Sequence, residues 1–403
     1  MSGYQSTDET GGSMSAVSLD RFREIFGQGK EPVSISVPGR VNLIGEHTDY
    51  NDGFVLPAAV NRYIHVTGRA RMDRCVAVHS IAFGEQHQFC LENEISPLLS
   101  GWKYFAEGVI RTVLTGADKQ VGMDLLVDND LPVGGGLSSS AAFAAGLGMI
   151  TAGLNRIELQ PLEFAGLLQK AEHKYVGVEC GIMDQLSILL SRRGSASLID
   201  CRSLQIDHIP IPADWSLVIM DTGVRHNLAF SEYSDRRLQC ARAVELYRQS
   251  GKELTSLRDV SAGDLDRLEK IAGSNSVFFH RCRHVVSENL RVTEAVQALR
   301  TSDEKQIGQL FRESHRSLGN DFEVTCHELD RMVEAAWHAP GCIAARMTGG
   351  GFGGCTVNFV KKDTTEQFIK ATLSGYSKKT GRTGTAIQVS SISGIMSCEG
   401  RLQ

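Results

Sequence analysis

The sequence predicts an α+β protein of two domains, with an active site in the cleft between the N- and C-terminal lobes. At 403 residues, the chain is longer than a single hydrophobic core usually supports. Segments with the two-residue alternation of strands lie among segments with the spacing of helices. No linker rich in Pro, Gly and Ser separates the halves. The two lobes are therefore expected to pack closely and to bind a ligand between them.

Changes in pattern along the chain predict the domain limits. Residues 1–17 are rich in Ser, Gly and Thr and lack the apolar core of a signal peptide, so a disordered extension is expected there. The N-terminal domain is predicted over residues 18–210 and the C-terminal domain over residues 211–403. The boundary is drawn at the Ile-Pro-Ile-Pro-Ala segment of residues 209–213.

Strand-like and helix-like segments follow one another through both domains. In the first domain, strands are expected at residues 33–37, 64–68 and 122–127, and helices at residues 139–154 and 162–175. The second domain is expected to begin at residues 217–220, and residues 232–300 carry Arg, Glu and Leu at helical spacing. Its remaining elements are strands at residues 344–347, 355–360 and 385–389 and a helix at residues 364–373.

The composition excludes several classes of partner. An apolar content of 42% and a charged content of 22% are typical of soluble globular proteins. A net charge of −5 gives no reason to expect a nucleic acid or an acidic membrane as partner, and no apolar run reaches the ~20 residues of a membrane span. Ten cysteines without a C-x-x-C pair predict reduced, mostly buried thiols rather than a disulfide framework. Since no Asn-x-Ser/Thr sequon occurs either, the cytoplasm is the expected compartment.

A polar run at residues 38–57 predicts a ligand site. Apolar residues flank the run, and a ligand rich in hydroxyls is expected because each buried hydroxyl needs a hydrogen-bond partner. The alternative is a helix start capped by Thr48 or Asp49 with an Asn-Asp-Gly turn, which would explain only one or two of the polar side chains. Those side chains are Arg40, Asn42, Glu46, His47, Asp49, Tyr50, Asn51 and Asp52.

A glycine-rich stretch at residues 130–142 follows a predicted strand and leads into a predicted helix. Its glycines allow the backbone to approach a ligand, and the free N–H groups of the helix start attract an anion. These features fit a nucleotide phosphate site, although no Gly-Lys-Ser/Thr of a Walker loop occurs. A glycine-rich turn capped by serine is the open alternative.

Two further patterns resemble sites but are interpreted differently. Gly349, Gly351 and Gly354 match G-x-G-x-x-G, yet a strand pattern follows them where a dinucleotide fingerprint requires a helix. His280 and His284 would share one face of a helix while Cys282 points away. We interpret that segment as a basic helix surface rather than a zinc site.

Asp184 precedes an apolar helical run and is therefore expected in the first turn of a helix. There the helix dipole and the free N–H groups favour its ionised form. From the pattern alone, an ordinary N-terminal helix acid is the favoured explanation of this residue.

The run at 38–57, the glycine-rich stretch at 130–142 and the glycines at 349–354 resemble, in this order, the motifs of galactokinases, members of the GHMP family of small-molecule kinases. The second stretch is similar to Pro-x-Gly-x-Gly-Leu-Ser-Ser-Ser-Ala, with Gly135 where galactokinases usually have Ala. The resemblance extends from about residue 18 to about residue 395. It implies the two-domain GHMP kinase fold, with ATP and Mg²⁺ as cofactors.

The resemblance also implies roles for single residues. Asp184 would orient the anomeric hydroxyl and accept its proton, or act as an electrostatic anchor, with Arg40 across from it. Ser140 and Glu172 would hold Mg²⁺. The phosphates would lie on Gly134, Gly135, Gly136, Leu137, Ser138, Ser139 and Ser140, and the sugar on Glu46, His47, Asp49, Gly181 and Tyr233. Asp49 is the candidate for recognising the axial C4 hydroxyl, because a pocket that pairs this group rejects the epimer.

The activity that the resemblance implies is the transfer of phosphate from ATP to the anomeric hydroxyl of D-galactose, giving galactose 1-phosphate and ADP, the kinase step of galactose catabolism (Leloir pathway). An N-acetylgalactosamine kinase and a catalytically silent sugar sensor are the main alternatives. A structural scaffold is the third, but it would not require polar groups at all three motifs. A monomer is expected.

Overall fold

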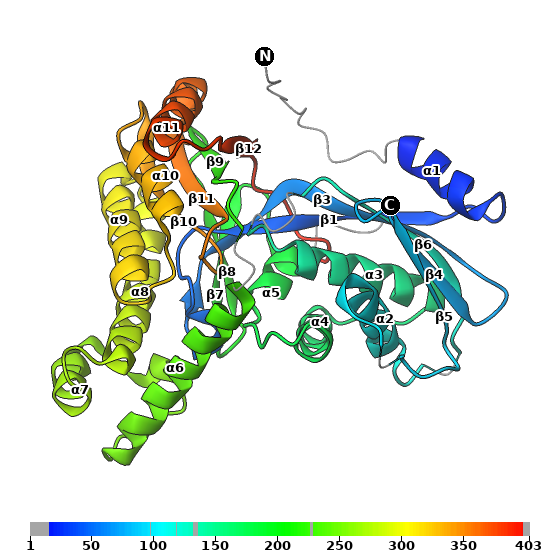
Figure 1. Cartoon of the computed structure of the whole chain (residues 1–403), viewed down its shortest axis with the longest axis horizontal. Helices are drawn as coiled ribbons and strands as arrows, with labels where there is room; N and C mark the ends of the chain where they lie inside the picture. The colour runs from blue at the N-terminus through cyan, green and yellow to red at the C-terminus, as the bar shows by residue number, and fades with distance from the viewer. Residues whose placement is uncertain (1–15, 97, 118, 132–135, 226–228, 398–403) are drawn as a thin grey trace.

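The computed structural model describes residues 16–96, 98–117, 119–131, 136–225 and 229–397 (Figure 1). Helix α1 (Ala16–Phe26) begins within the predicted disordered extension, and the rest of that extension lies outside the described residues. Helices α6 to α11 lie on one side of the molecule, and a five-stranded sheet with α2 to α4 lies on the other (Figure 1). The predicted α+β fold is confirmed, whereas the domain boundary near residue 210 stays a prediction.

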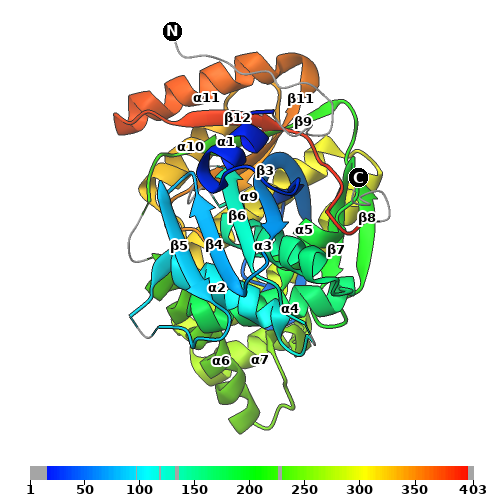
Figure 2. The ribbon, with the colours of Figure 1, turned by 90° about the vertical axis from the view of Figure 1, so that its right-hand side faces the viewer.

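The N-terminal lobe is built on a mixed sheet with the strand order β1-β3-β6-β4-β5. Strands β4 and β6 pair in parallel and the other neighbours are antiparallel; β5, β4, β6 and β3 stand side by side in Figure 2. The strands are β1 (Val33–Asn42), β3 (Pro57–Ala70), β4 (Cys75–Ser80), β5 (Glu85–Cys90) and β6 (Met123–Asn129). The helices are α2 (Gly101–Leu114), α3 (Ser139–Asn155), α4 (Pro161–Tyr175) and α5 (Met183–Leu190).

Helix α3 packs on β1 and β3 because its residues are small. Its Gly146 faces Val66 of β3, and a Cβ atom on that glycine would lie 2.6 Å from Val66 Cγ2. The close approach fixes the middle of α3 against the sheet, and the helix begins at the predicted phosphate site.

The C-terminal lobe has an antiparallel sheet in the order β10-β11-β9-β12, covered by helices. Its strands are β9 (Trp215–Asp221), β10 (Cys342–Met347), β11 (Cys355–Lys361) and β12 (Thr385–Val389). Its helices are α6 (Ala229–Gln249), α7 (Leu265–Ala272), α8 (Val277–Arg300), α9 (Glu304–Asn320), α10 (His327–Trp337) and α11 (Thr365–Thr380). A third, small sheet joins β2 (Phe54–Val55), β7 (Ser195–Asp200) and β8 (Ile206–Pro210), and single turns of 3-10 helix occur at η1 (Asp49–Asn51), η2 (Leu257–Asp259), η3 (Ala262–Asp264) and η4 (Lys362–Thr364).

After β12 the chain returns to the N-terminal lobe. Ser391 forms a bridge with Val60 of β3. The amides of Ile395 and Met396 then donate to the carbonyls of Ile188 and Leu189 in α5, at 3.1 and 2.9 Å. The two lobes are thus connected both by the chain crossing from β8 to β9 and by this returning segment.

Most predicted elements are present, with different limits. Strand β12 coincides with its prediction, whereas β1 and β3 are longer and α11 extends to Thr380. The hairpin β4–β5, helix α2 and the pair β7–β8 were not predicted. In the hairpin, β5 is polar and lacks a clear alternation. None of the described helices combines the length and apolar character that crossing a bilayer requires.

The interpretation of residues 280–284 as a basic helix surface was wrong. These residues belong to α8, but Arg281 is only 1% exposed and His284 is fully buried. Arg281 donates to Gln239 Oε1 at 2.7 Å, and His284 contacts Ser317 Oγ at 2.9 Å. Buried polar partners on other elements, which the local sequence does not reveal, allow these side chains to lie inside.

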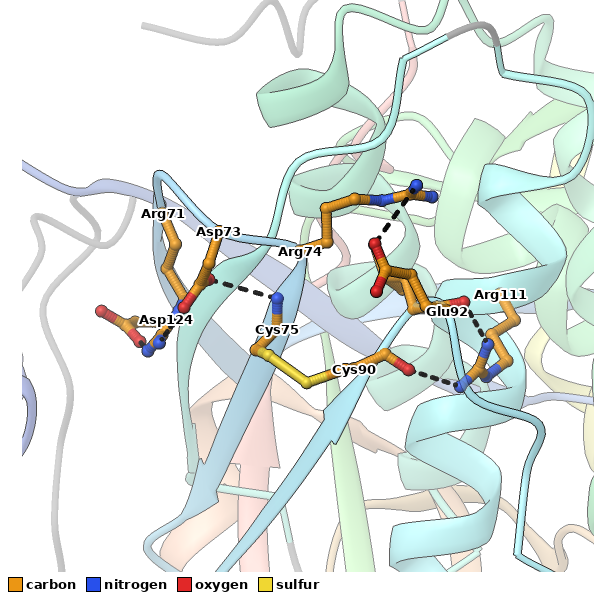
Figure 3. The surroundings of a disulfide bond; sticks show 9 residues. Arg71, Asp73, Arg74, Cys75, Cys90, Glu92, Arg111 and Asp124 are labelled. Atoms are coloured by element: carbon orange, nitrogen blue, oxygen red, sulfur yellow. Dashed lines mark hydrogen bonds and ion pairs between the residues drawn. A yellow bond between two sulfur atoms is a disulfide. The ribbon is translucent and has the colours of Figure 1, made fainter.

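The prediction that the cysteines are reduced was wrong for one pair. Cys75 of β4 and Cys90 of β5 are bonded to each other (Figure 3). They are directly opposite in the hairpin register, and the amide of Leu91 donates to the carbonyl of Arg74, so they form a non-hydrogen-bonded pair, where side chains are closest. Seven other cysteines are free thiols, and Cys398 lies outside the described residues.

Candidate active site

The polar run begins where β1 ends. The register between β1 and β3 shifts at Pro38 and Gly39, which turns Arg40 toward the start of α5. Gly39 permits this path, since a Cβ atom there would lie 2.5 Å from Leu131 and 2.7 Å from the carbonyl of Leu137. The amide of Arg40 donates to that same carbonyl at 3.1 Å. The run is thereby fixed to the glycine-rich stretch that precedes α3.

The rest of the run is a tight turn. His47 and Asp52 adopt left-handed backbone conformations, with φ of 62° and 57°. Thr48 Oγ1 donates to the carbonyl of Gly45 at 2.8 Å, and Asn51 Nδ2 donates to the carbonyl of His47 at 2.9 Å. Thr48 and Asn51 therefore hold the turn, but the Thr48 side chain does not cap the 3-10 helix that follows it, so the capping alternative is not met. Other polar residues of the run are left to face a ligand.

One cavity of about 220 Å³ gathers the predicted sugar and catalytic residues. Its wall also includes the glycine loop between β10 and β11, which the resemblance to the third GHMP motif places beside the sugar. That loop joins two strands, so the exclusion of a dinucleotide fingerprint is confirmed. The lining residues are Arg40, Glu46, His47, Asp49, Val178, Cys180, Gly181, Met183, Asp184, Tyr233, Gly349, Gly350, Gly351 and Phe352.

Asp184 lies in the first turn of α5, as predicted, and both of its oxygens are engaged. Arg40 Nε and Nη2 each lie 2.7 Å from Oδ1, and Ser138 Oγ donates to Oδ2 at 2.6 Å. Arg40 Nη1 also donates to the carbonyl of Gly136 at 2.5 Å. A buried cation, a serine from the glycine-rich stretch and a helix terminus thus converge on one carboxylate.

Glu172 of α4 faces the start of α3. Ser140 Oγ donates to its Oε1 and Gln185 Nε2 donates to its Oε2, both at 2.8 Å. Burial raises the pKa of Glu172 to about 7, the charge of Asp184 adds to the rise, and these hydrogen bonds oppose it. The predicted pair for Mg²⁺, Ser140 and Glu172, is therefore brought together.

Among the sugar-binding candidates, Glu46 and His47 are buried while Asp49 and Tyr233 are half-buried, and the side chains differ in charge. Burial raises the pKa of Asp49 to about 7, and the nearby charge of Asp184 adds to this rise. Burial lowers the pKa of His47 to about 3, so the imidazole is neutral near pH 7. His47 Nδ1 lies 2.8 Å from the hydroxyl of Tyr50, and the rings of His47 and Tyr233 are 5.5 Å apart. The cavity therefore offers a neutral imidazole and carboxyl groups as partners for hydroxyls.

Gly181 lines the cavity and also packs against the Asp49 side chain. A Cβ atom at position 181 would stand 2.0 Å from Asp49 Oδ2. Only glycine leaves room for this carboxylate in its present orientation.

A second cavity of about 210 Å³ lies beside the start of α3. Ser139 and Ser140 border it, and aromatic rings form much of its wall, among them Trp102, which stacks on Phe83 with centroids 5.6 Å apart. The sequence analysis missed this cavity because Phe83 and Trp102 lie outside the predicted elements and carry no motif. Its remaining lining residues are Ile64, Ser80, Ala82, Phe105, Val127, Asn129 and Phe143.

The predicted phosphate residues are only partly described. Gly134 and Gly135 lie outside the described residues. Gly136 has a φ of 74°, which favours glycine, and the Leu137 side chain is buried in the core. Ser138 contacts Asp184 and Ser140 contacts Glu172, which leaves Ser139 at the second cavity as the serine without a carboxylate partner among the described contacts.

Comparisons with known proteins agree with this geometry. The galactokinase galactose-binding signature matches residues 20–70, and the GHMP kinase N-terminal and C-terminal domains match residues 104–192 and 295–378. A galactokinase of Chloroflexus aggregans is 46% identical over 363 residues, covering 90% of this chain and 92% of that protein. A galactokinase of Actinobacillus pleuropneumoniae is 38% identical over 368 residues, covering 91% and 94%.

Solved structures give the same result. The Lactococcus lactis galactokinase complexed with galactose has a TM-score of 0.88 and 34% identity, and the match covers 94% of this chain and 98% of that one. A mevalonate kinase at 16% identity, with a TM-score of 0.64, shares the fold alone. On sequence and structure together, the chain belongs to the galactokinase family of the GHMP kinases.

Proposed function

We propose that the protein is an ATP- and Mg²⁺-dependent galactokinase, which phosphorylates the anomeric hydroxyl of D-galactose and releases galactose 1-phosphate and ADP. The observation that carries this function is the contact of Arg40 with Asp184 in the cavity that Glu46, His47 and Asp49 also line. Relatives named as galactokinases and a related structure complexed with galactose support the choice of sugar.

Phosphoryl transfer to a hydroxyl requires an oriented nucleophile, neutralisation of charge and an acceptor for the proton. Asp184 meets the first and third requirements when the anomeric hydroxyl donates to it. Arg40 holds Asp184 Oδ1 at 2.7 Å and brings positive charge beside the reacting groups. Both possible roles of Asp184, proton acceptor and electrostatic anchor, need the carboxylate in this orientation.

The sugar lies on the wall that the polar run and the glycine loop form together. A neutral hexose needs acceptors for its hydroxyl protons and donors for its oxygens, and buried carboxyl groups and an imidazole supply both. Asp49 is the proposed partner of the axial C4 hydroxyl. An epimer would leave Asp49 unpaired, which is the basis of discrimination.

The residues at the start of α3 fit Mg²⁺. This ion is commonly held by one or two carboxylates together with substrate phosphates, and Glu172 Oε1 and Ser140 Oγ lie 2.8 Å apart there. When bound, the ion would neutralise charge on the nucleotide phosphates. Glu172 would have to be ionised to hold it, and its raised pKa makes this sensitive to pH near neutrality.

The second cavity is the proposed site of the adenine ring. Its aromatic side chains suit a flat heterocycle, and its border at Ser139 and Ser140 adjoins the phosphate site. A monomer is the proposed state of the protein. Because ATP with Mg²⁺ is the abundant nucleotide form inside cells, the cytoplasm is the proposed compartment.

ADP release from Mg·ATP, measured in parallel with galactose, N-acetylgalactosamine, glucose and no sugar, tests the function. We expect strong turnover with galactose alone. A preference for N-acetylgalactosamine would retain the mechanism and change the substrate. Binding of galactose without ADP release would identify a sensor and overturn the proposal.

A further inference from the structure

A cluster of buried charged side chains lies behind the sugar cavity, between the two lobes. Glu46 comes from the polar run, Glu288 and Arg291 from α8, and Arg346 from the end of β10. Arg346 and Glu288 are fully buried and Glu46 is 2% exposed. Such charges are tolerated inside a protein only when they are paired and hydrogen-bonded.

Arg346 connects the polar run to the C-terminal lobe. Its Nη1 forms an ion pair with Glu46 Oε2 and donates to the carbonyl of Leu43 at 2.9 Å. Two residues further along the chain, Thr348 Oγ1 and the amide of Gly349 each lie 3.2 Å from Glu46 Oε1. The carboxylate of Glu46 is thus held by β10 and by the first residues of the glycine loop.

Glu288 is not an equivalent partner for Arg346. Arg291 Nε donates to Glu288 Oε2 at 2.7 Å, while Ser314 Oγ and the amide of Gly45 donate to Oε1 at 2.6 and 3.1 Å. Arg346 approaches Glu288 only to 4.0 Å. Among the residues that the structure describes, no hydrogen-bond acceptor reaches Arg346 Nε or Nη2. Glu46 is therefore the main counter-charge of Arg346.

We propose that Arg346 is a positioning residue of the kinase reaction, which orients the Glu46 carboxylate for one hydroxyl of the sugar and fixes the glycine loop beside it. The inference rests on the proposed sugar-binding role of Glu46. Arg346 does not line the cavity, so it acts through Glu46 and the loop rather than by contact with the substrate.

Arg346→Lys keeps the charge but replaces the planar guanidinium, whose Nη1 contacts both the Leu43 carbonyl and the Glu46 carboxylate, by an ammonium group on a flexible stem. Arg291→Met is the matched control, because it disturbs the same buried cluster through Glu288 without touching Glu46. For both variants and for Glu46→Gln, we would measure melting temperature and kcat and KM for galactose and for ATP. A set of deoxygalactoses, each lacking one hydroxyl other than the anomeric one, completes the experiment.

For Arg346→Lys we expect the galactose KM to rise about tenfold, which corresponds to the loss of one charge-assisted hydrogen bond. The ATP KM should change less than twofold. One deoxygalactose should be used equally well by the wild type, Arg346→Lys and Glu46→Gln, because it lacks the hydroxyl that Glu46 accepts. Arg291→Met should lower the melting temperature and leave the galactose KM unchanged.

An unchanged galactose KM in Arg346→Lys, or equal losses for every deoxygalactose, would overturn the inference and leave Arg346 a structural residue only. A wild-type protein that releases no ADP with galactose would instead contradict the proposed function. The two failures are therefore distinguishable.

Discussion

Arg40 at the end of β1 and Asp184 at the start of α5 form an ion pair 2.7 Å long, with side chains 6% and 26% exposed. The two residues are far apart in the sequence, and the bulge at Gly39 and the first turn of α5 bring them together. The arginine is almost enclosed while the carboxylate still faces the cavity. Asp184 can therefore contact a ligand while its ion pair with Arg40 stays intact.

Asp184→Asn should reduce kcat by about 10³-fold or more, because the amide can neither accept the proton nor balance Arg40. ATP affinity, measured by calorimetry, should remain near that of the wild type. Asp207→Asn is the control, since Asp207 pairs with Arg300 at the surface and should be neutral. Near-normal turnover in Asp184→Asn would show that another group accepts the proton.

The galactose KM should depend on pH through Asp49. Its pKa is raised from 3.8 to about 7, so the folded protein holds a proton there between these values that the unfolded chain has lost. The folded state without ligand should accordingly lose stability as pH rises through this window. If the ionised form binds the sugar, the galactose KM should increase about tenfold per pH unit below 7.

Asp49→Asn should remove this pH dependence of the galactose KM while weakening binding at all pH values. Steady-state kinetics from pH 5.5 to 8.5 would test it. A pH profile that is the same in wild type and variant would exclude Asp49 as the titrating group.

Gly181→Ala should raise the galactose KM by about tenfold or more, since its Cβ would stand 2.0 Å from Asp49 Oδ2 and displace that carboxylate. Gly166→Ala in α4 is the matched control, because open space surrounds that position and alanine favours the helix by about 1 kcal/mol. Kinetics and thermal unfolding of both variants provide the comparison. Equal galactose KM values in Gly181→Ala and Gly166→Ala would mean that sugar binding does not depend on the present position of Asp49.

Removing the disulfide by Cys75→Ser with Cys90→Ser should lower the free energy of unfolding by up to about 3 kcal/mol, because the unfolded chain regains the entropy that closing a loop of this length removes. The galactose KM should not change, because neither cysteine lines that cavity. Cys326→Ser, a free thiol at the start of α10, is the control and should be nearly neutral. Titration of the unfolded protein should detect two more thiols after reduction; an equal count would mean that the pair is not oxidised.

The sequence predicted those parts of the site that are local in the chain. Asp184 and the residues from Arg40 to Asp49 lie in short motifs, and their convergence follows from the family that those motifs resemble. Arg346 and Glu288 carry no motif, and their pairing with the polar run depends on contacts between β10, α8 and the turn at Gly45. The sequence therefore indicated the ligand but not the buried charges that support its site.

The disulfide and the aromatic cavity were missed for a related reason. Strand β5 has exposed polar residues, so no alternation indicated the hairpin that brings Cys75 and Cys90 together. Trp102 contacts Phe83 only because helix α2 packs beside that hairpin. Both features depend on contacts between separate secondary-structure elements, and local residue patterns do not reveal such contacts.

The returning segment has a consequence for synthesis. A chain emerging from the ribosome makes the N-terminal lobe first, and domains usually fold in that order. Here α5, which carries Asp184, lacks its contacts with Ile395 and Met396 until those two residues have been made, after both lobes. The nascent enzyme therefore cannot assemble its reaction centre in full when the N-terminal lobe alone has been synthesised, which delays catalysis until both lobes exist.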